Sequence, residues 1–380
     1  MEKVDFLVIR NHTCENDARI EKLLFHLKKQ HISVQVVCLS RDANVCGRTS
    51  SGNISHDSIQ LSMSPYMENL PRPYRRFRLI LQVVKVLFLL RKRFIFRSGW
   101  GCDFDGFFLI YALRKFYLKR PKTIFEVYDP WSTMVQNNLI RELEAYFFDF
   151  ADFLIMPARD SRLKIKGRDV HTLGNELIPP LANEIMKREE FDFSKIASQP
   201  FILVGGTLSR HNHLSILVEA AKQIPEIHVL ICLTSDQLIQ LVKAELPANV
   251  VPIGHVSWSR WLSLLSHATA CWVYYDETVD HFQSHISPNK YWESLLFQTN
   301  MIVNNLQQFS DRVIEIEPCI AEIGRDDSSI LRLERAIRLY LELRHGVRVE
   351  PATLESYFEI VERQRDNTVT SIAKKVMLAR

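Results

Sequence analysis

Two series of short apolar runs, each alternating with helical apolar patterns, constrain the fold of this chain more than any other feature. In the first series, an apolar run at residues 4–10 precedes a helical pattern at residues 20–27, and a second run follows at residues 33–39. Further runs lie at residues 123–128 and 153–156. Strand, helix and strand at this spacing indicate βαβ units and a parallel sheet, in which ligands bind where the strands end.

The second series begins after a change of composition. Residues 178–200 contain Pro179-Pro180 and a charged stretch, a combination that favours a linker. A chain of 380 residues is long for one core. We therefore predict an α/β protein with two Rossmann-like parallel-sheet domains, at residues 1–180 and 196–350. In the second domain, strands are predicted at residues 200–207, 228–232, 249–253, 270–275 and 300–304, and helices at 213–223, 237–244, 258–267 and 289–297.

Composition excludes several other classes. With 47% apolar and 24% charged residues, the chain is neither disordered nor a multi-span membrane protein. The seven cysteines are scattered and odd in number, so they indicate neither a disulfide framework nor a zinc site, and we expect buried free thiols in a reducing compartment. The N-terminus has no signal-peptide pattern, which predicts a cytoplasmic protein.

The stretch from Ser287 to Val303 is the most informative for chemistry. A helix that begins after Pro288 directs free backbone N–H groups toward an anion, as at diphosphate sites, and Asn289 and Lys290 lie in its first turn. Glu293 lies three residues further on, where a carboxylate can accept hydrogen bonds from ribose hydroxyls. The plainer alternative is an amphipathic helix with a Lys and Glu pair on its exposed face.

A glycine turn opens the second domain. Gly205 and Gly206 follow the strand at residues 200–207, where glycine lets the backbone approach a ligand closely. Thr207, Ser209 or Arg210 can reach phosphate oxygens from this turn. The alternative is an ordinary tight turn between a strand and a helix.

These segments resemble the group 1 glycosyltransferases of the GT-B fold. The sequence SPNKYWESLLFQTNMIV is similar to the family's donor-binding helix, and residues 201–220 are similar to its first donor-domain strand, turn and helix. Residues 250–256 are similar to the loop that holds the nucleobase, which assigns His255 and Val256 to the donor site. The resemblance implies a GT-B architecture with an interdomain cleft and a C-terminal helix, about residues 354–380, that returns to the first domain. It also implies that Lys290 contacts the diphosphate and Glu293 the ribose.

The first half resembles the family more loosely, through residues 16–20, 125–129 and 151–155. Asp129 follows a strand, and we predict that it is the general base for the acceptor hydroxyl. An aspartate before proline is also a common start of a turn, which is the alternative for this residue.

Three positions depart from the family pattern and limit which members of the family the chain resembles. His285 stands where many retaining members have a glutamate, and Asn212 and Leu233 replace a lysine and a glycine of the family pattern. The remaining pattern is most similar to the divergent, xanthan-type glucuronosyltransferase-like members. The stereochemical outcome stays open.

A basic segment from Arg72 to Arg97 holds nine Lys or Arg residues and no acidic residue. Its apolar positions Leu79, Val83, Val86, Leu87 and Leu90 predict an amphipathic helix that lies in a membrane interface rather than spanning the bilayer. Packing of the same face on its own domain is the alternative, and no nucleic-acid-binding motif accompanies the segment. The basic residues assigned to the membrane and acceptor side are Arg75, Arg76, Arg78, Lys85, Arg91, Lys92 and Arg93.

The resemblance thus implies a hexosyltransferase that uses a UDP- or GDP-sugar, without metal or cofactor. The implied acceptor is a lipid-linked saccharide in surface polysaccharide biosynthesis, and the implied location is the cytoplasm, including the inner face of the membrane. Three alternatives are a sugar-nucleotide epimerase, a non-catalytic nucleotide-sugar-binding protein, and a GT-A enzyme that binds metal through Asp103 and Asp105.

Overall fold

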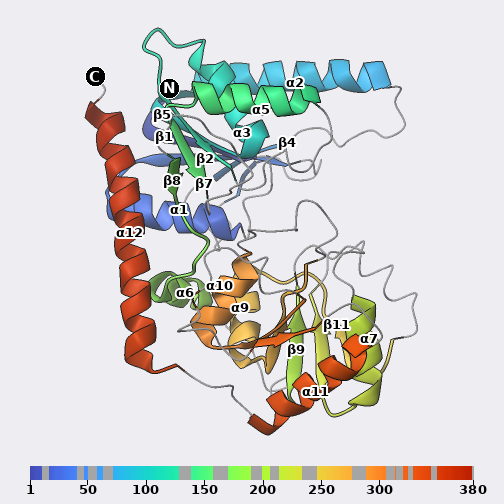
Figure 1. The fold of residues 1–380 in the computed structure, drawn as a ribbon. Coiled ribbons are helices and arrows are strands. Elements are labelled where there is room, and N and C mark those ends of the chain that lie inside the picture. Colours follow the sequence, from blue (N-terminus) through green and yellow to red (C-terminus); the bar gives the residue numbers. More distant parts are fainter. Residues whose placement is uncertain are drawn as a thin grey trace. The chain divides into compact units, whose positions relative to one another are not determined.

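The computed structural model divides the chain into two compact units (Figure 1). Unit 1 contains residues Met1–Gly174 and Arg363–Arg380, and unit 2 contains Asn175–Glu362. The sequence placed the end of the first domain at residue 180, whereas unit 1 ends at Gly174. The structure describes residues 1–10, 17–40, 47–49, 58–62, 72–127, 138–156, 170–189, 199–205, 214–232, 246–275, 288–304, 313, 320–323, 328–343 and 349–378.

Unit 1 is built on a sheet that has eight strands among the described residues, in the order β3-β4-β2-β1-β5-β6-β7-β8. All neighbouring strands are parallel except β3 and β4. Its elements are β1 (Glu2–Arg10), α1 (Ala18–Lys29), β2 (Val34–Ser40), β3 (Gly47–Thr49), β4 (Ser58–Ser62), α2 (Arg72–Arg93), β5 (Phe94–Cys102), α3 (Asp103–Arg114), β6 (Lys122–Glu126), α5 (Asn138–Phe150), β7 (Phe153–Met156), β8 (Val170–Thr172) and the end of α12 (Pro351–Leu378).

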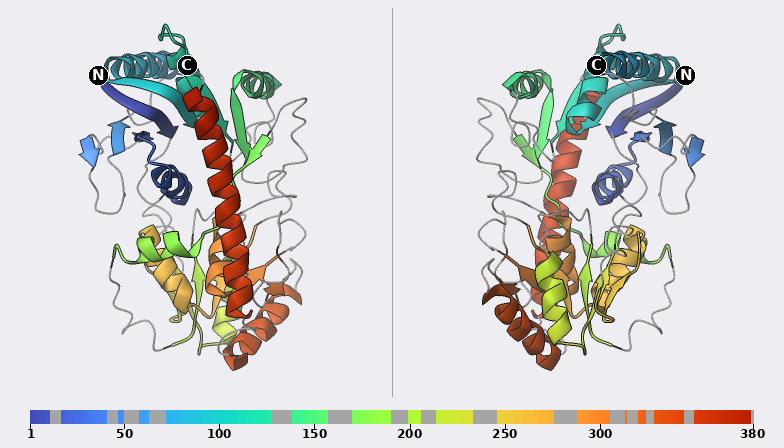
Figure 2. Two further views of the ribbon diagram at one scale, coloured as in Figure 1. Left: turned by 90° about the vertical axis from the view of Figure 1, so that its left-hand side faces the viewer. Right: turned by 90° about the vertical axis from the view of Figure 1, so that its right-hand side faces the viewer.

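Helices cover both faces of this sheet. On one face, α1 packs beside the end of α12, and Ile20, Leu24, Val369 and Ile372 share one buried cluster (Figure 2). On the other face, Leu90 of α2 and Ile110 of α3 share a second cluster, and α3 contacts α5. The C-terminal helix therefore completes the core of unit 1, as predicted.

Unit 2 holds a sheet of six described strands, all parallel, in the order β11-β10-β9-β12-β13-β14. Its elements are α6 (Pro179–Met186), β9 (Phe201–Val204), α7 (Leu214–Gln223), β10 (His228–Ile231), β11 (Val250–Pro252), α9 (Trp258–His267), β12 (Ala270–Trp272), α10 (Asn289–Phe297), β13 (Asn300–Val303), β14 (Ile320–Glu322), α11 (Ser328–Leu343) and the beginning of α12.

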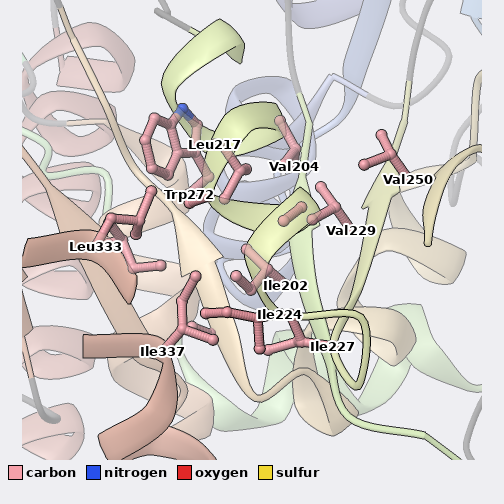
Figure 3. Packing of buried hydrophobic residues seen from close by; sticks show 14 of the residues in the cluster. Ile202, Val204, Leu217, Ile224, Ile227, Val229, Val250, Trp272, Leu333 and Ile337 are labelled. Atoms are coloured by element: carbon pink, nitrogen blue, oxygen red, sulfur yellow. The ribbon is translucent and has the colours of Figure 1, made fainter. Parts of the chain in front are cut away.

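The core of unit 2 lies between the sheet and the helices α7 and α11. Ile202 and Val204 of β9 contact the same apolar cluster as Leu217 of α7 and Leu333 and Ile337 of α11 (Figure 3). The helices α9 and α10 cover the opposite face (Figure 1). Strands buried on both faces produce the continuous apolar runs seen in the sequence.

Several expectations differ from the observed elements. The predicted linker contains α6, whose proline pair occupies its first turn, where no backbone N–H is needed. The basic segment is not one helix, because β5 begins at Phe94 and its strand contains Arg97. The helix predicted at residues 237–244 lies outside the described residues.

Candidate functional site

The centre of the unit 2 sheet is a topological switch point. The chain leaves β9 toward β10 and β11, then returns to β12 on the other side of β9 and continues to β13 and β14. In open parallel sheets, ligands bind outside the carboxyl ends of the two strands at which the order reverses. Here those ends lead to Gly205, which follows β9, and to Val273–Tyr275, which follows β12.

Lys290 reaches this switch point from the first turn of α10. Its Nζ donates to the carbonyl oxygen of Gly205 at 3.0 Å and lies 5.1 Å from the centroid of the Tyr275 ring. Pro288 is the N-cap of α10, so the helix begins where the sequence predicted. The unpaired N–H groups of a first turn and an adjacent ammonium form an arrangement that can bind a diphosphate.

Glu293 has a different environment from the one the sequence indicated. Its side chain is 3% exposed, and its two carboxylate oxygens accept hydrogen bonds from two indoles. Trp258 Nε1 donates to Oε1 at 2.9 Å, and Trp261 Nε1 donates to Oε2 at 2.8 Å. The alternative of an exposed Lys and Glu pair is therefore wrong, and a contact between Glu293 and ribose stays a prediction.

The two tryptophans were not among the predicted site residues, although their sequence carries a signal. Trp258 and Trp261 lie three residues apart on an amphipathic helix, so their side chains share one face. A buried indole N–H requires an acceptor. The acceptor is far away in sequence, and the pairing appears only when α9 and α10 pack together.

Gly205 owes its lack of a side chain to packing. A Cβ atom added there would lie 2.3 Å from Cζ3 and 2.8 Å from Cη2 of Trp261. An aromatic ring of the same unit therefore lies close to this glycine, and the approach of a ligand to Gly205 stays a prediction.

The loop that follows β11 contains the other described donor-site residues. Gly254 has a φ of 78°, a left-handed conformation that favours glycine. His255 is exposed and Val256 is half-buried. Among the described strands β11 is the last on its side of the sheet, two positions from β9. The assignment of His255 and Val256 to the nucleobase stays a prediction.

Several predicted site residues lie outside the described residues. They are the proposed base Asp129 and the donor-side residues Gly206, Thr207, Arg210 and Ser287. Arg75, Arg76 and Arg78 belong to α2, but their side chains are not among those described.

The switch point of unit 1, between β1 and β5, carries an ion cluster. Arg10 ends β1 and donates to Asp17 Oδ2 at 2.9 Å and to the carboxylate of Asp103, which starts α3. Burial raises the pKa of Asp17, but Arg10 and Arg19 outweigh it and hold the pKa below its usual value. Asp103 is thus bound to an arginine at the end of a parallel strand.

The structure corrects one part of the membrane prediction, namely which face of helix α2 is free to meet lipid. Val83, Val86, Leu87 and Leu90, which were assigned to a lipid-facing surface, pack in the core of unit 1. The outward face instead exposes a second apolar stripe at helical spacing, together with exposed basic residues. This outward stripe consists of the apolar residues Leu81, Val84 and Phe88, and the exposed basic residues beside it are Lys85 and Lys92. No helix among the described residues is both long and apolar enough to cross a bilayer.

Two further basic residues of α2 whose side chains the structure describes, Arg91 and Arg93, have local partners. Arg91 donates from Nε to the carbonyl oxygen of Phe116 at 3.1 Å and lies over the Tyr117 ring, with 4.5 Å between its Cζ and the ring centroid. Arg93 lies 3.7 Å from a carboxylate oxygen of Glu2. These contacts hold the C-terminal end of α2 on its own unit.

The cysteines differ in part from the predicted buried free thiols. Cys38 is disulfide-bonded, so the expectation that all cysteines are free is wrong, because distance along the chain does not determine distance in space. Cys102, Cys232 and Cys271 are buried thiols, and burial raises the pKa of Cys271 to about 11. Within the described part of the chain, no three His, Cys, Asp or Glu side chains lie close enough to hold a metal ion.

A cavity of about 550 Å³ lies in unit 1 at the amino end of β7, where the helices α3 and α5 end. Its lining includes Arg114, Arg120 and Lys375. Arg114 and Lys122 approach the Asp152 carboxylate to 3.2 and 3.1 Å. Nothing in the sequence indicated this cavity.

Two parallel Rossmann-like sheets in one chain, each with a switch point, define the GT-B class of fold, and the GT-A alternative is therefore wrong. Neither a protein-family model nor a curated protein sequence matches the chain. Solved structures match it along nearly its whole length, and the predicted fold is confirmed by them.

Sucrose-phosphate synthase from Thermosynechococcus elongatus is similar at 14% identity and a TM-score of 0.61, covering 100% of this chain and 97% of that one. HepE from Anabaena, in complex with UDP and glucose, is similar at 11% identity and a TM-score of 0.57, covering 98% of each chain. A UDP-N-acetylglucosamine 2-epimerase is similar at 12% identity and a TM-score of 0.60, covering 99% of this chain and 96% of that one.

Proposed function

We propose that the protein is a glycosyltransferase whose unit 2 binds a nucleoside-diphosphate sugar and whose unit 1 binds the acceptor. The observation that carries the proposal is Lys290, whose ammonium lies at the switch point beside Gly205 and the first turn of α10. A helix N-terminus and a lysine both favour the two negative charges of a diphosphate. The likeness to HepE with UDP and glucose supports the same class of ligand.

The proposed reaction moves the sugar from the diphosphate to an acceptor hydroxyl. A base, assigned to Asp129, takes the hydroxyl proton while the acceptor oxygen attacks the anomeric carbon. The bond between the anomeric carbon and the phosphate oxygen breaks, and the nucleoside diphosphate leaves with the electron pair. Lys290 and the helix N-terminus stabilise the charge that develops on this leaving group.

Thermal-shift screening of UDP- and GDP-sugars tests the donor site, because a ligand that binds only the folded state raises its stability. We expect one nucleotide series to stabilise the protein and Lys290→Met to remove the stabilisation. Lys222→Met is the matched control, because Lys222 is exposed on α7 and pairs with Glu219. Equal stabilisation of both variants would refute the role of Lys290.

Two other functions use the same donor site. An epimerase of the kind represented by UDP-N-acetylglucosamine 2-epimerase would change the donor without an acceptor. A non-catalytic protein would bind the donor and release no product. Release of nucleoside diphosphate that depends strictly on an acceptor separates the proposed transferase from both, and its persistence in excess chelator tests the proposed independence from metal.

We further propose that the acceptor is a lipid-linked saccharide in surface polysaccharide biosynthesis, and that the enzyme works at the inner face of the membrane. The outward stripe of α2 supports this role, because apolar side chains beside lysines suit a surface of anionic lipids. Phe88 is 69% exposed and is the most exposed apolar residue of this stripe.

Co-sedimentation with vesicles, with and without phosphatidylglycerol, tests the membrane proposal. We expect Phe88→Ser to reduce binding to anionic vesicles. Leu331→Ser is the control, because Leu331 is an apolar residue of unit 2 with 50% exposure. The proposal would be refuted if the bound fraction were the same with and without phosphatidylglycerol and the same for the wild type and Phe88→Ser.

A further inference from the structure

The carboxylate of Glu293 joins two neighbouring helices of unit 2. It accepts one indole N–H from Trp258 and one from Trp261, at 2.9 and 2.8 Å. The tryptophans belong to α9 and the glutamate to α10. Hydrogen bonds to a charged group in a buried site are stronger than bonds between neutral groups. The three side chains therefore fix how α9 and α10 sit against each other.

One of these tryptophans also contacts the predicted donor turn. The ring of Trp261 lies directly on Gly205, where it occupies the space of a side chain. From α10, Lys290 holds the carbonyl oxygen of the same glycine at 3.0 Å. Helix α10 thus holds the end of β9 twice, directly through Lys290 and indirectly through Glu293 and Trp261.

The position of Glu293 suits this support better than contact with a ligand. A carboxylate reaches ribose hydroxyls with its oxygens, and each oxygen here accepts one indole N–H, so a hydroxyl would have to approach the second acceptor site of an oxygen that an indole already covers. Only 3% of the residue is exposed. The indoles that cover it are themselves 7% and 8% exposed.

We propose that Glu293 is a positioning residue of the donor site, which clamps Trp258 and Trp261 so that Gly205 and Lys290 face the diphosphate, and that it does not bind the ribose. The inference rests on the proposed function, because it concerns the same donor site. It assigns recognition of the ribose to other residues of unit 2.

A comparison of two ligands separates positioning from contact. Isothermal titration measures the binding of UDP and of 2′,3′-dideoxy-UDP, or of the matching guanine pair if screening selects GDP-sugars. A residue that contacts the hydroxyls affects only the ligand that has them. A residue that positions the turn affects both ligands by the same factor, because both carry the diphosphate.

The variants are Glu293→Gln and Trp261→Phe, with Glu219→Gln as the control, since Glu219 is an exposed residue of α7 that pairs with Lys222. Gln keeps the size of Glu293 but presents an NH2 group to one indole N–H. Phe keeps an aromatic ring at 261 but lacks the donor. We expect each to weaken both ligands by about tenfold, as loss of a buried charged hydrogen bond predicts. We expect Glu219→Gln to bind as the wild type does.

Three results would overturn the inference. In the first, Glu293→Gln weakens UDP but not the dideoxy ligand, which assigns a ribose contact. In the second, folded variants bind both ligands as tightly as the wild type, which leaves the clamp without effect on the site. In the third, Glu293→Gln does not fold and Trp261→Phe leaves binding unchanged. Failure of the proposed function is distinguishable from failure of this inference, because it appears in the wild-type titration. If the wild-type protein binds neither uridine diphosphate nor guanosine diphosphate, the proposed function itself is refuted.

Discussion

Replacing Gly205 by alanine tests the packing on which the donor site depends. The added Cβ atom would lie 2.3, 2.8 and 3.0 Å from three ring carbons of Trp261. That ring cannot turn away freely, because its N–H is bonded to Glu293 at 2.8 Å. The alanine must therefore displace either the end of β9 or a hydrogen-bonded tryptophan.

The magnitude follows from two opposing terms. Overpacking a close-packed site costs about 1–3 kcal/mol. Alanine also restricts the unfolded chain, which stabilises the folded state by about 0.4–1 kcal/mol where the backbone conformation permits it. The difference of these terms spans about 0–2.6 kcal/mol, and from their mid-range values we expect Gly205→Ala to lower the free energy of unfolding of unit 2 by about 1.3 kcal/mol. In a Trp261→Leu background the clash is gone, so the same alanine becomes neutral or stabilising.

Hydrogen exchange measured by mass spectrometry suits this test, because two units in one chain need not unfold together. The quantity is the opening free energy of peptides from β9 and β12 in the four members of the double-mutant cycle. The reasoning predicts a change of sign between the two backgrounds. An equal cost of Gly205→Ala with and without Trp261 would refute it.

Further predictions concern a titrating pair, a buried amide and the proposed base. Burial lowers the pKa of His26 to about 4, although its bond with Asp366 opposes the change. The unfolded chain therefore binds a proton that the folded unit 1 does not, and stability falls as the pH decreases from 6.5 to about 4, by about 3 kcal/mol in total; urea unfolding at pH 7 and pH 4.5 measures the fall, and His26→Gln should flatten it. Asn249 Nδ2 donates to three carbonyl oxygens, at 2.8, 3.2 and 2.9 Å, so Asn249→Asp should destabilise unit 2 more than Asn249→Ala in urea unfolding, and the reverse order would contradict this account. Asp129→Asn should slow transfer by about 10²–10⁴-fold while donor affinity in titrations is kept, and unchanged turnover would remove Asp129 as the base.

Much of the fold could be predicted because it depends on local patterns. The helices at Trp258–His267 and Asn289–Phe297 and the strand at Phe153–Met156 occur where periodicity and end signals placed them. Two elements were missed, α6 within the supposed linker and β5 within the basic segment. β5 has buried residues at alternate positions, among them Phe94, Phe96 and Trp100, but the helical apolar pattern of α2 runs directly into it, so the sequence alone does not show where the helix ends and the strand begins.

The sequence by itself determined that two parallel sheets form and that Lys290 starts a helix after Pro288, since alternating strand and helix patterns and a proline at a helix end act over a few residues. Only the tertiary structure decided which groups meet. In the folded protein Val86 and Leu90 of α2 are buried in the core, and the ring of Trp261 packs on Gly205. Glu293 accepts hydrogen bonds from two indoles. The bond between Trp261 and Glu293 joins residues 32 positions apart, and the bond between Lys290 and Gly205 joins residues 85 positions apart. Residues so far separated are brought together by packing of whole elements, which no local pattern encodes.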